Sequence, residues 1–346
     1  FVWLHLLLLL GRRRKFCTTS MLRDGVNWAV WRAILGKVGT ELFEPGNEAR
    51  LAKARERFPR LDQALKRFGP PPKALLQKMK SGPSFMKKVP YDASQALPVA
   101  QMKQFFEQGY CVARGAVPPS VTDAALRHIN ASLGRNAIEQ TTPNLTNLEK
   151  GATAEPAITN LFYASSATHL VESLLGPGNA APVRQGQVAL RFPTEGPCSS
   201  EEQELRRGRA YHVDGFAKGL HSPFTVLVGV CLSDQPQPLC GNLAVHPGAH
   251  WRLQSQVRDL LGRQDDDLAR KPDLGPPTTL LLRKGDVVLC HQKLPHLGQS
   301  NYSPHVRYQV YFRVKHVHLD DHRDRWLDDL LLPFDGLRAA LLLPQQ

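Results

Sequence analysis

The chain has 346 residues, of which 42% are hydrophobic and 22% charged, and its formal net charge at pH 7 is +13. This composition is typical of a soluble globular protein with a large core. The six cysteines are scattered and include no Cys-x-x-Cys pair, which argues against a disulfide framework or a zinc site. We therefore expect an intracellular protein with reduced thiols.

Much of the positive charge lies near the N-terminus. Residues 48–88 contain 12 Lys or Arg and 3 Asp or Glu. We interpret this segment as a solvated helical face, and a targeting or docking arm is the alternative. We expect no nucleic-acid partner.

The first ten residues are apolar apart from His5, and Arg12-Arg13-Arg14-Lys15 follow shortly after them. This run is shorter than the roughly 20 residues that span a bilayer, so we expect no transmembrane segment. The basic residues come after the apolar run, whereas in a secretory signal they come before it. The chain begins with Phe1, which suggests an incomplete N-terminus or a start at Met21. We expect a cytoplasmic location, with mitochondrial or plastid import as the alternative.

Hydrophobic periodicity and turn residues divide the chain into an extension (1–93, a leader and a basic helical segment), a main domain (94–318) and a tail (319–346). Helices are expected over residues 95–108, 121–133 and 167–175. Strands are expected over residues 110–117, 185–192, 209–216, 224–232, 242–245, 278–282, 286–290 and 305–314. Helices followed by many short strands predict a mainly β chain with N-terminal helices, whose core is a β-sandwich or jelly roll.

Three His-x-Asp pairs occur in the chain: His212 with Asp214, and two pairs at 318/320 and 322/324. Residues two apart in a strand face the same side, so such a pair can offer an imidazole nitrogen and a carboxylate oxygen to one metal ion. A second histidine would complete the 2-His-1-carboxylate face that leaves positions open on Fe(II). Only His212 and Asp214 have a long downstream stretch with candidate partners.

The third ligand is sought near the end of a later strand. His296 follows the strand expected at 286–290, and Arg307 lies eleven residues further on, in a strongly β-type run. A buried arginine needs an anionic partner, and a dicarboxylate would suit its guanidinium. His291 remains the competing ligand. The full set of downstream candidates is His221, His246, His250, His291, His296, His305, His316, His318 and His322.

Several motifs occur in a characteristic order. They are Phe106-Glu107-Gln108-Gly109-Tyr110, Leu190-Arg191-Phe192-Pro193, His212-Val213-Asp214-Gly215, Gly241-Asn242-Leu243-Ala244-Val245-His246-Pro247-Gly248-Ala249-His250, Gly285-Asp286-Val287-Val288, and His296 with Asn301 and Arg307. Over residues 94 to 318 this order resembles the phytanoyl-CoA dioxygenase family of Fe(II)- and 2-oxoglutarate-dependent oxygenases. The resemblance implies a double-stranded β-helix, a cupin-like jelly roll.

By that resemblance, the iron ligands are His212, Asp214 and His296, and Arg307 binds the distal carboxylate of 2-oxoglutarate. Gln187 and Arg191, on one face of a strand, are expected to make further cosubstrate contacts, although Arg191 stands where a lysine is common in the family. His246 and His250 are interpreted as loop histidines.

The implied enzyme is a non-haem iron dioxygenase that uses Fe(II), 2-oxoglutarate and O2. It would hydroxylate a small-molecule or lipid-type substrate and release succinate and CO2. The carboxylate of Asp214 favours hydroxylation, since related halogenases lack it. Two alternatives stay open: a non-catalytic jelly-roll protein that binds metal or ligand, and a hydrolase with zinc in the same ligands.

Overall fold

The structure is a computed structural model of the whole chain. It describes residues 31, 34, 41–43, 45–73, 76, 89–135, 138–142, 145–148, 150–198, 200–205, 211–215, 223–256 and 274–342. The leader expected within residues 1–20 lies outside these residues.

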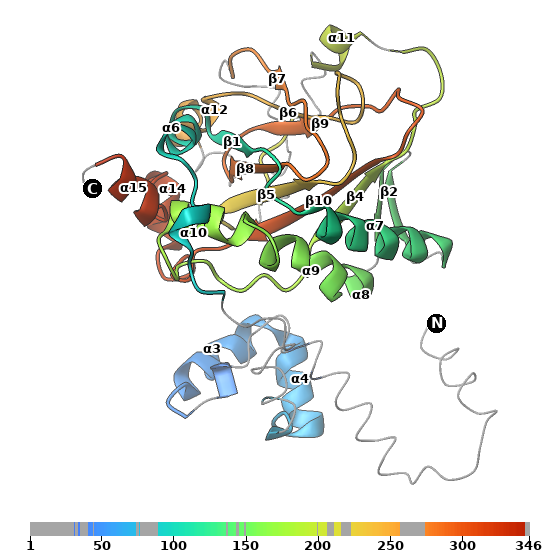
Figure 1. Cartoon of the computed structure of the whole chain (residues 1–346). Helices are drawn as coiled ribbons and strands as arrows, with labels where there is room; N and C mark the ends of the chain where they lie inside the picture. Colours follow the sequence, from blue (N-terminus) through green and yellow to red (C-terminus); the bar gives the residue numbers. More distant parts are fainter. Residues whose placement is uncertain are drawn as a thin grey trace, which may run out of the picture. The chain divides into compact units, whose positions relative to one another are not determined.

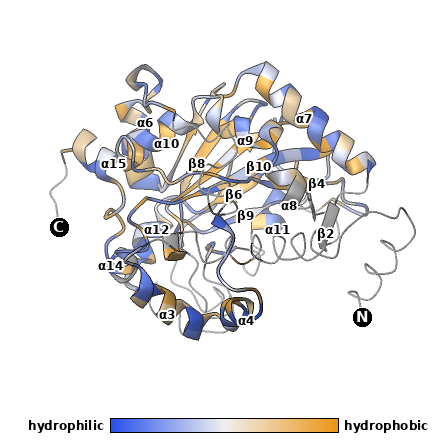
Figure 2. Cartoon of the chain, turned by 90° about the horizontal axis from the view of Figure 1, so that it is seen from below, coloured by the Kyte–Doolittle hydropathy of each residue, from blue (hydrophilic) through white to orange (hydrophobic). Residues whose placement is uncertain are grey.

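The chain folds as two compact units, Phe1–Met86 and Lys87–Gln346. The first unit contains η2 (Glu41–Phe43), α3 (Glu48–Arg57) and α4 (Pro59–Phe68). Its small core is formed by Trp31, Leu61 and Ala64, which are buried. Helix α3 is amphipathic, and its hydrophilic and hydrophobic residues alternate as blue and orange in Figure 2. The helical pieces expected in this region are therefore present.

The second unit is built on a seven-stranded sheet in which every neighbouring pair is antiparallel. Its strand order is β1-β8-β5-β10-β4-β3-β2. The bounds are β1 (Tyr110–Ala113), β8 (Val287–His291), β5 (Val226–Cys231), β10 (Arg307–Val314), β4 (Gln187–Arg191), β3 (Leu145–Leu148) and β2 (Ile138–Thr142).

A smaller antiparallel sheet, β7-β6-β9, lies on one face of the large sheet (Figure 1). Its strands are β7 (Thr278–Thr279), β6 (Leu243–Val245) and β9 (His296–Gly298). Leu243 and Val245 pack against Leu227, Val288 and Cys290 of the large sheet. The space between the two sheets is thus lined by side chains from both.

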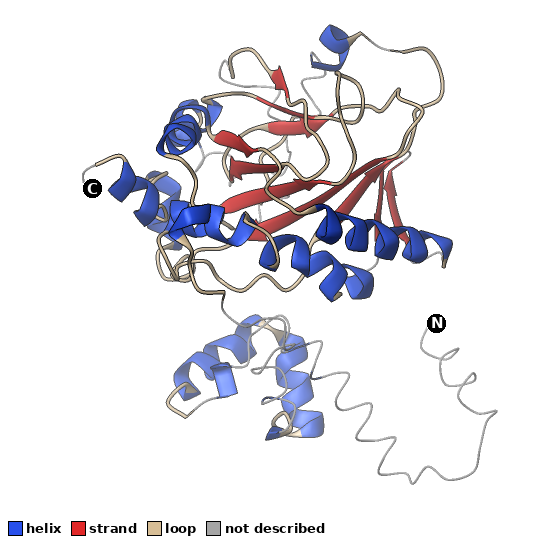
Figure 3. Ribbon diagram, in the orientation of Figure 1, coloured by secondary structure: helices blue, strands red, loops and turns tan. Residues whose placement is uncertain are grey.

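Helices cover the opposite face of the large sheet, as the red strands and blue helices in Figure 3 show. Their apolar sides form one core with the inward residues of the strands, and the hydrophobic colouring in Figure 2 is concentrated in those strands. The main helices are η4 (Ala93–Gln95), α6 (Val99–Gln108), α7 (Pro119–Gly134), α8 (Lys150–Thr153), α9 (Pro156–Tyr163) and α10 (Ala167–Leu175).

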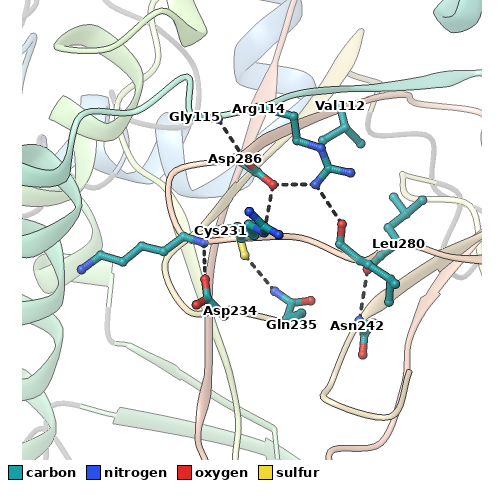
Figure 4. Close-up of polar contacts among 12 residues, drawn as sticks. Val112, Arg114, Gly115, Cys231, Asp234, Gln235, Asn242, Leu280 and Asp286 are labelled. Carbon is teal, nitrogen blue, oxygen red and sulfur yellow. Dashed lines mark hydrogen bonds and ion pairs between the residues drawn. The ribbon is translucent and has the colours of Figure 1, made fainter. Parts of the chain in front are cut away.

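The start of β8 is fixed by a carboxylate. Asp286 accepts hydrogen bonds from the backbone N–H of Gly115 at 2.9 Å and of Arg283 at 2.8 Å, and from Nη1 of Arg114 at 2.6 Å (Figure 4). Nearby, the Asn242 side chain donates to the carbonyl of Leu280 at 3.1 Å, which joins β6 to the segment after β7. Asp286 and Asn242, two residues of the sequence motifs, therefore stabilise the framework of strands and turns.

The C-terminal residues pack on the same unit. They form α14 (Arg323–Asp328) and α15 (Asp335–Ala340). Trp326 of α14, Leu337 of α15 and Phe334, just before α15, are buried. The ammonium group of Lys293, itself buried, donates to the carbonyls of Trp326 at 2.8 Å and Leu327 at 3.0 Å. Since C-terminal helix carbonyls lack helical partners, this cation satisfies two of them.

Most expected elements appear with small shifts in their ends, and the helix at 167–175 agrees fully with α10. The strand expected at 209–216 is wrong for the residues described there, where His212 forms only an isolated bridge. The description as mainly β also needs correction, because helical residues outnumber strand residues in the part of the chain that the structure describes. Both sheets of the second unit are antiparallel. The domain boundaries at 93/94 and 318/319 stay predictions.

No helix in the described part of the chain is both long and apolar enough to cross a membrane. Two further short helices, α11 (Glu201–Leu205) and α12 (Ala249–Arg252), and the turn η5 (Gln254–Gln256) lie beside the small sheet or in its connections.

Gly109 ends α6 in the left-handed conformation, with φ +78°, and a Cβ there would lie 2.6 Å from Nδ1 of His250 and 2.9 Å from Cδ1 of Leu294. We expect Gly109→Ala to lower the free energy of unfolding by about 2–4 kcal/mol, from backbone strain plus overpacking. Gly115, with φ +60°, is the matched control, because a Cβ there would meet no atom within 4 Å.

Gly115→Ala should lose only the backbone contribution, about 1–2 kcal/mol. Chemical denaturation of both variants measures the difference. Equal losses would show that the close approach of His250 and Leu294 has no energetic weight.

Candidate metal centre

A pair of backbone hydrogen bonds brings the two motif histidines together. His212 and His296 form an isolated antiparallel bridge, in which each N–H donates to the other's carbonyl at 3.0 Å. Their ring centroids lie 4.6 Å apart. Because directly opposed residues of an antiparallel pair project to the same side, residues 84 positions apart present adjacent imidazoles.

Asp214 joins the two histidines from the turn that follows His212. Its Oδ1 lies 3.4 Å from Nε2 of His212, and one ligand atom from each of the three residues lies within 4.8 Å of the others. Two imidazoles and one carboxylate at this spacing fit Fe(II) or a similar divalent ion, with positions left open. Among the described residues this is the one group of three or more metal-ligating side chains found.

The ring orientation of His296 also fits a ligand. Its Nδ1 lies 2.9 Å from the carbonyl oxygen of Leu294. A carbonyl only accepts, so Nδ1 carries the proton and Nε2 keeps its lone pair. Burial, with the neighbouring His212, lowers the pKa of His296 to about 4, which keeps the ring neutral near pH 7.

Asp214 is held in the ionised form. Burial alone would raise its pKa, but the hydrogen bond with His212 and the nearby His296 and Arg313 hold that pKa well below its usual value. The backbone carbonyl of Asp214 accepts from the side chain of Gln292 at 3.1 Å. The side chain and the main chain of this residue are therefore both fixed.

The other histidines near the site serve packing. His291 is buried on the helix-covered side, where its ring stacks on Phe334 and its Nε2 lies 3.2 Å from the carbonyl of Leu330. His246 packs on Tyr211, and His250 lies 3.2 Å from the carbonyl of Phe106. The geometry thus favours His296 over His291 as the third ligand.

Arg307 points into the space between the sheets from the first position of β10. It is 3% exposed, and its Nε and Nη1 donate to the carbonyls of Gly241 at 2.8 Å and Ala189 at 3.1 Å. Gly241 has φ +75°, and a Cβ there would lie 3.1 Å from Cβ of Arg307. Only glycine therefore lets this backbone approach and hold the guanidinium.

Arg191 lies directly opposite Arg307 in the pairing of β4 with β10. Its guanidinium packs against Gly298, where a Cβ would be 2.6 Å from Nη2, and Gly298 follows His296 by two residues on β9. Burial and the positive charge of Arg307 lower the pKa of Arg191 to about 10, so Arg191 remains a cation at neutral pH.

The two guanidiniums are not paired with any carboxylate of the described residues. No ion pair among the described residues involves Arg191 or Arg307, and the buried Nε of Arg191 has no hydrogen-bond partner there. The acid acting on Arg191 is the buried Glu204 of α11, whose Oε2 accepts from the N–H of Ser300 at 3.2 Å. Two opposed guanidiniums, one buried and one partly buried, form a strong site for an anion.

Gln187 lies at the other end of β4, where its Oε1 accepts from Nη1 of Arg313 at 2.8 Å. Arg313 is a site residue that sequence reasoning missed. Its Nε and Nη2 donate to Oδ2 of Asp214 at 3.0 and 2.7 Å. The available signal was its even spacing from Arg307, six residues earlier, which places both on one face of a strand.

The family model for phytanoyl-CoA dioxygenase (PhyH) matches residues 105–308, more than half of the chain. The chain belongs to the phytanoyl-CoA dioxygenase family. This confirms the predicted family and the general reaction class, that of an iron-binding oxidoreductase, a dioxygenase dependent on Fe(II), 2-oxoglutarate and O2. Among curated proteins, none matches the chain at a significant level.

Several solved structures are similar to this family member. The non-haem α-ketoglutarate-dependent carbocyclase SnoK from nogalamycin biosynthesis is 19% identical, with 66% of this chain and 90% of SnoK covered at a TM-score of 0.48. The epimerase SnoN of the same biosynthesis is 16% identical (63% and 80% covered, TM-score 0.48). HygX from Streptomyces hygroscopicus, with nickel and 2-oxoglutarate bound, is 16% identical (64% and 88% covered, TM-score 0.44).

The ligand assignment can be tested by metal binding alone. We expect His296→Gln to lower the affinity for Co(II) by about 100-fold or more, because it removes one ligand of three. His305→Gln, at an exposed histidine on the same segment, should leave the affinity unchanged. Isothermal titration calorimetry with Co(II) measures both.

His291→Gln distinguishes the competing ligand. If a folded His291→Gln variant lost Co(II) binding while His296→Gln kept it, the third ligand would be His291 and the assignment above would be wrong.

Proposed function

We propose that this protein is an Fe(II)- and 2-oxoglutarate-dependent hydroxylase, with His212, Asp214 and His296 as the iron ligands. The observation that carries the proposal is the combination of this triad with the opposed guanidiniums of Arg191, partly buried, and Arg307, buried, on the same face of the large sheet. A structural His–Asp pair would need no such anion site beside it.

The proposed fold is a jelly roll of the double-stranded β-helix type. Two antiparallel sheets face each other, and the triad lies where β9 of the small sheet meets the turn that carries Asp214. This arrangement supports the finer fold assignment, since β9 and the segment bridged to it then present the metal ligands to the face of the large sheet that carries Arg313.

When bound, iron and 2-oxoglutarate supply the oxidation, in which the cosubstrate becomes succinate and CO2 and one oxygen atom of O2 enters the substrate. The contribution of the chain is binding and orientation. We assign Arg307 to the distal carboxylate of 2-oxoglutarate, because backbone carbonyls fix its fork and burial excludes water from it.

Arg191 is assigned to the same dianion. It lies opposite Arg307 and beside the strand that carries His296, so it can attract the cosubstrate toward the metal. A dianion between two guanidiniums relieves the repulsion that lowers the pKa of Arg191. Arginine here replaces the lysine common in the family and offers a bidentate contact.

Hydroxylation is proposed over halogenation because the carboxylate of Asp214 is present and already held at the site. The proposed substrate is a small molecule or a lipid-type compound. A cytoplasmic location is proposed from the cysteines, since Cys111, Cys198, Cys231, Cys240 and Cys290 are all free among the described residues.

The direct test measures succinate. Protein purified without oxygen is supplied with Fe(II), 2-oxoglutarate and O2, and slow uncoupled turnover is expected to release succinate even without the true substrate. A His212→Ala variant provides the background. Succinate at the background level, across a panel of lipid and amino-acid substrates, would instead support a non-catalytic binding protein. Hydrolysis with zinc bound would support the zinc alternative.

The role of Arg307 gives a sharper prediction. We expect Arg307→Ala to raise the 2-oxoglutarate concentration needed for half-maximal succinate release by about 10- to 100-fold, because a charge-assisted bidentate contact is lost. The Fe(II) concentration needed should stay within about threefold. Arg307→Lys should recover part of the loss.

Arg184→Ala, at an exposed arginine just before β4, is the control and should change neither requirement. An equal rise in the iron and 2-oxoglutarate requirements would contradict the assignment, since it would indicate damage to the whole site.

A further inference from the structure

The two oxygens of Asp214 have different partners. Oδ1 faces the histidines, at 3.4 Å from Nε2 of His212. Oδ2 accepts two hydrogen bonds from Arg313, from Nε at 3.0 Å and from Nη2 at 2.7 Å. One oxygen is therefore available to a metal, and the other is bound to a cation.

Arg313 is in turn held by the sheet. Its Nη1 donates to Oε1 of Gln187 at 2.8 Å, and its guanidinium carbon lies 5.9 Å from the centre of the Phe224 ring. Gln187 is directly opposite Tyr311, two residues before Arg313 on the same face of β10. The guanidinium is thus oriented by neighbouring strands, which position side chains more firmly than loops do.

A carboxylate can bind a metal through one oxygen or through both. In a 2-His-1-carboxylate site the open positions must accept 2-oxoglutarate through two atoms and O2 through one. A second bond from Asp214 would fill one of them. What holds Oδ2 away from the metal therefore decides whether the site can take both cosubstrates.

We propose that Arg313 is a positioning residue that keeps Asp214 bound to the metal through Oδ1 alone, and that Gln187 orients Arg313 for this task. The proposal rests on the metal site proposed above. It gives Gln187 a role in orienting Arg313 in place of the cosubstrate contact suggested by its strand position. It also explains why the guanidinium of Arg313 lies beside the proposed metal site, although its positive charge opposes the binding of a metal ion.

This last point separates positioning from a purely structural role. Removing Arg313 removes a positive charge and frees Oδ2, so the metal should bind at least as tightly as before, while an open position is lost. A structural role predicts the opposite, namely weaker metal binding with the coordination unchanged.

The experiment uses Mn(II) as the probe in the full chain. Water-proton relaxation of the Mn(II)-loaded protein reports the number of exchangeable waters on the metal, and titration of Mn(II) gives its affinity. For Arg313→Leu we expect the relaxation enhancement to fall by about one third, one water of three, with an unchanged or higher affinity. Arg313→Lys should restore part of the enhancement, because one charged donor remains.

Gln187→Leu should shift the enhancement in the same direction by a smaller amount, and it decides the question if Arg313→Leu does not fold. Arg184→Leu, at the exposed arginine used above, should match the parent protein. Melting temperatures confirm that each variant is folded.

Parent-like relaxation and affinity in folded Arg313→Leu and Gln187→Leu would overturn the proposal, as would weaker Mn(II) binding with the number of waters unchanged. A parent protein that binds no Mn(II) and releases no succinate would instead contradict the proposed function. The two failures are therefore distinguishable.

Discussion

The two-residue period of β10 is the constraint on which both the core and the site depend. Val310, Phe312 and Val314 project into the helix-covered core and are buried. The alternate positions, which include Arg307 and Arg313, face the small sheet. Since a slip of one residue would exchange the two faces, the apolar core that fixes the register also fixes both guanidiniums.

Position along the same strand then separates two functions. Arg307 and Arg313 are six residues apart, which is roughly 20 Å of strand. At one end Arg307 meets Arg191, and no ion pair in the described part of the chain neutralises either of them. At the other end Arg313 is neutralised by Asp214. We therefore assign Arg307 and Arg191 to an anion, and Arg313 to the orientation of Asp214, the proposed ligand.

The sequence predicted those parts of the site that short motifs specify. Metal and cosubstrate binding require particular residue types, so the order of those residues along the chain could locate them. The His-x-Asp pair, the later histidine and the strand arginine are His212, Asp214, His296 and Arg307. The structure brings all four to one side of the large sheet. Arg313 could not be found in this way, because its role comes from hydrogen bonds to two segments remote in sequence. Strand β9 was not predicted for the same reason. It has only three residues, and its partners, β6 and the bridge at His212, are remote in sequence.

The residues predicted as a C-terminal tail make tertiary contacts with the loop that leads to His296. The loop between β8 and β9 connects two histidines that face opposite sides. His291, at its start, faces the helices, and His296, at its end, faces His212 and Asp214. Within this loop the side chain of Gln292 holds the backbone of Asp214, and Lys293 binds the carbonyl end of α14. A buried ammonium left without those carbonyls would be costly, so the loop and the C-terminal helices stabilise each other. The residues after 318 therefore support the loop that leads to His296, the proposed third ligand, although no motif within them points to that role.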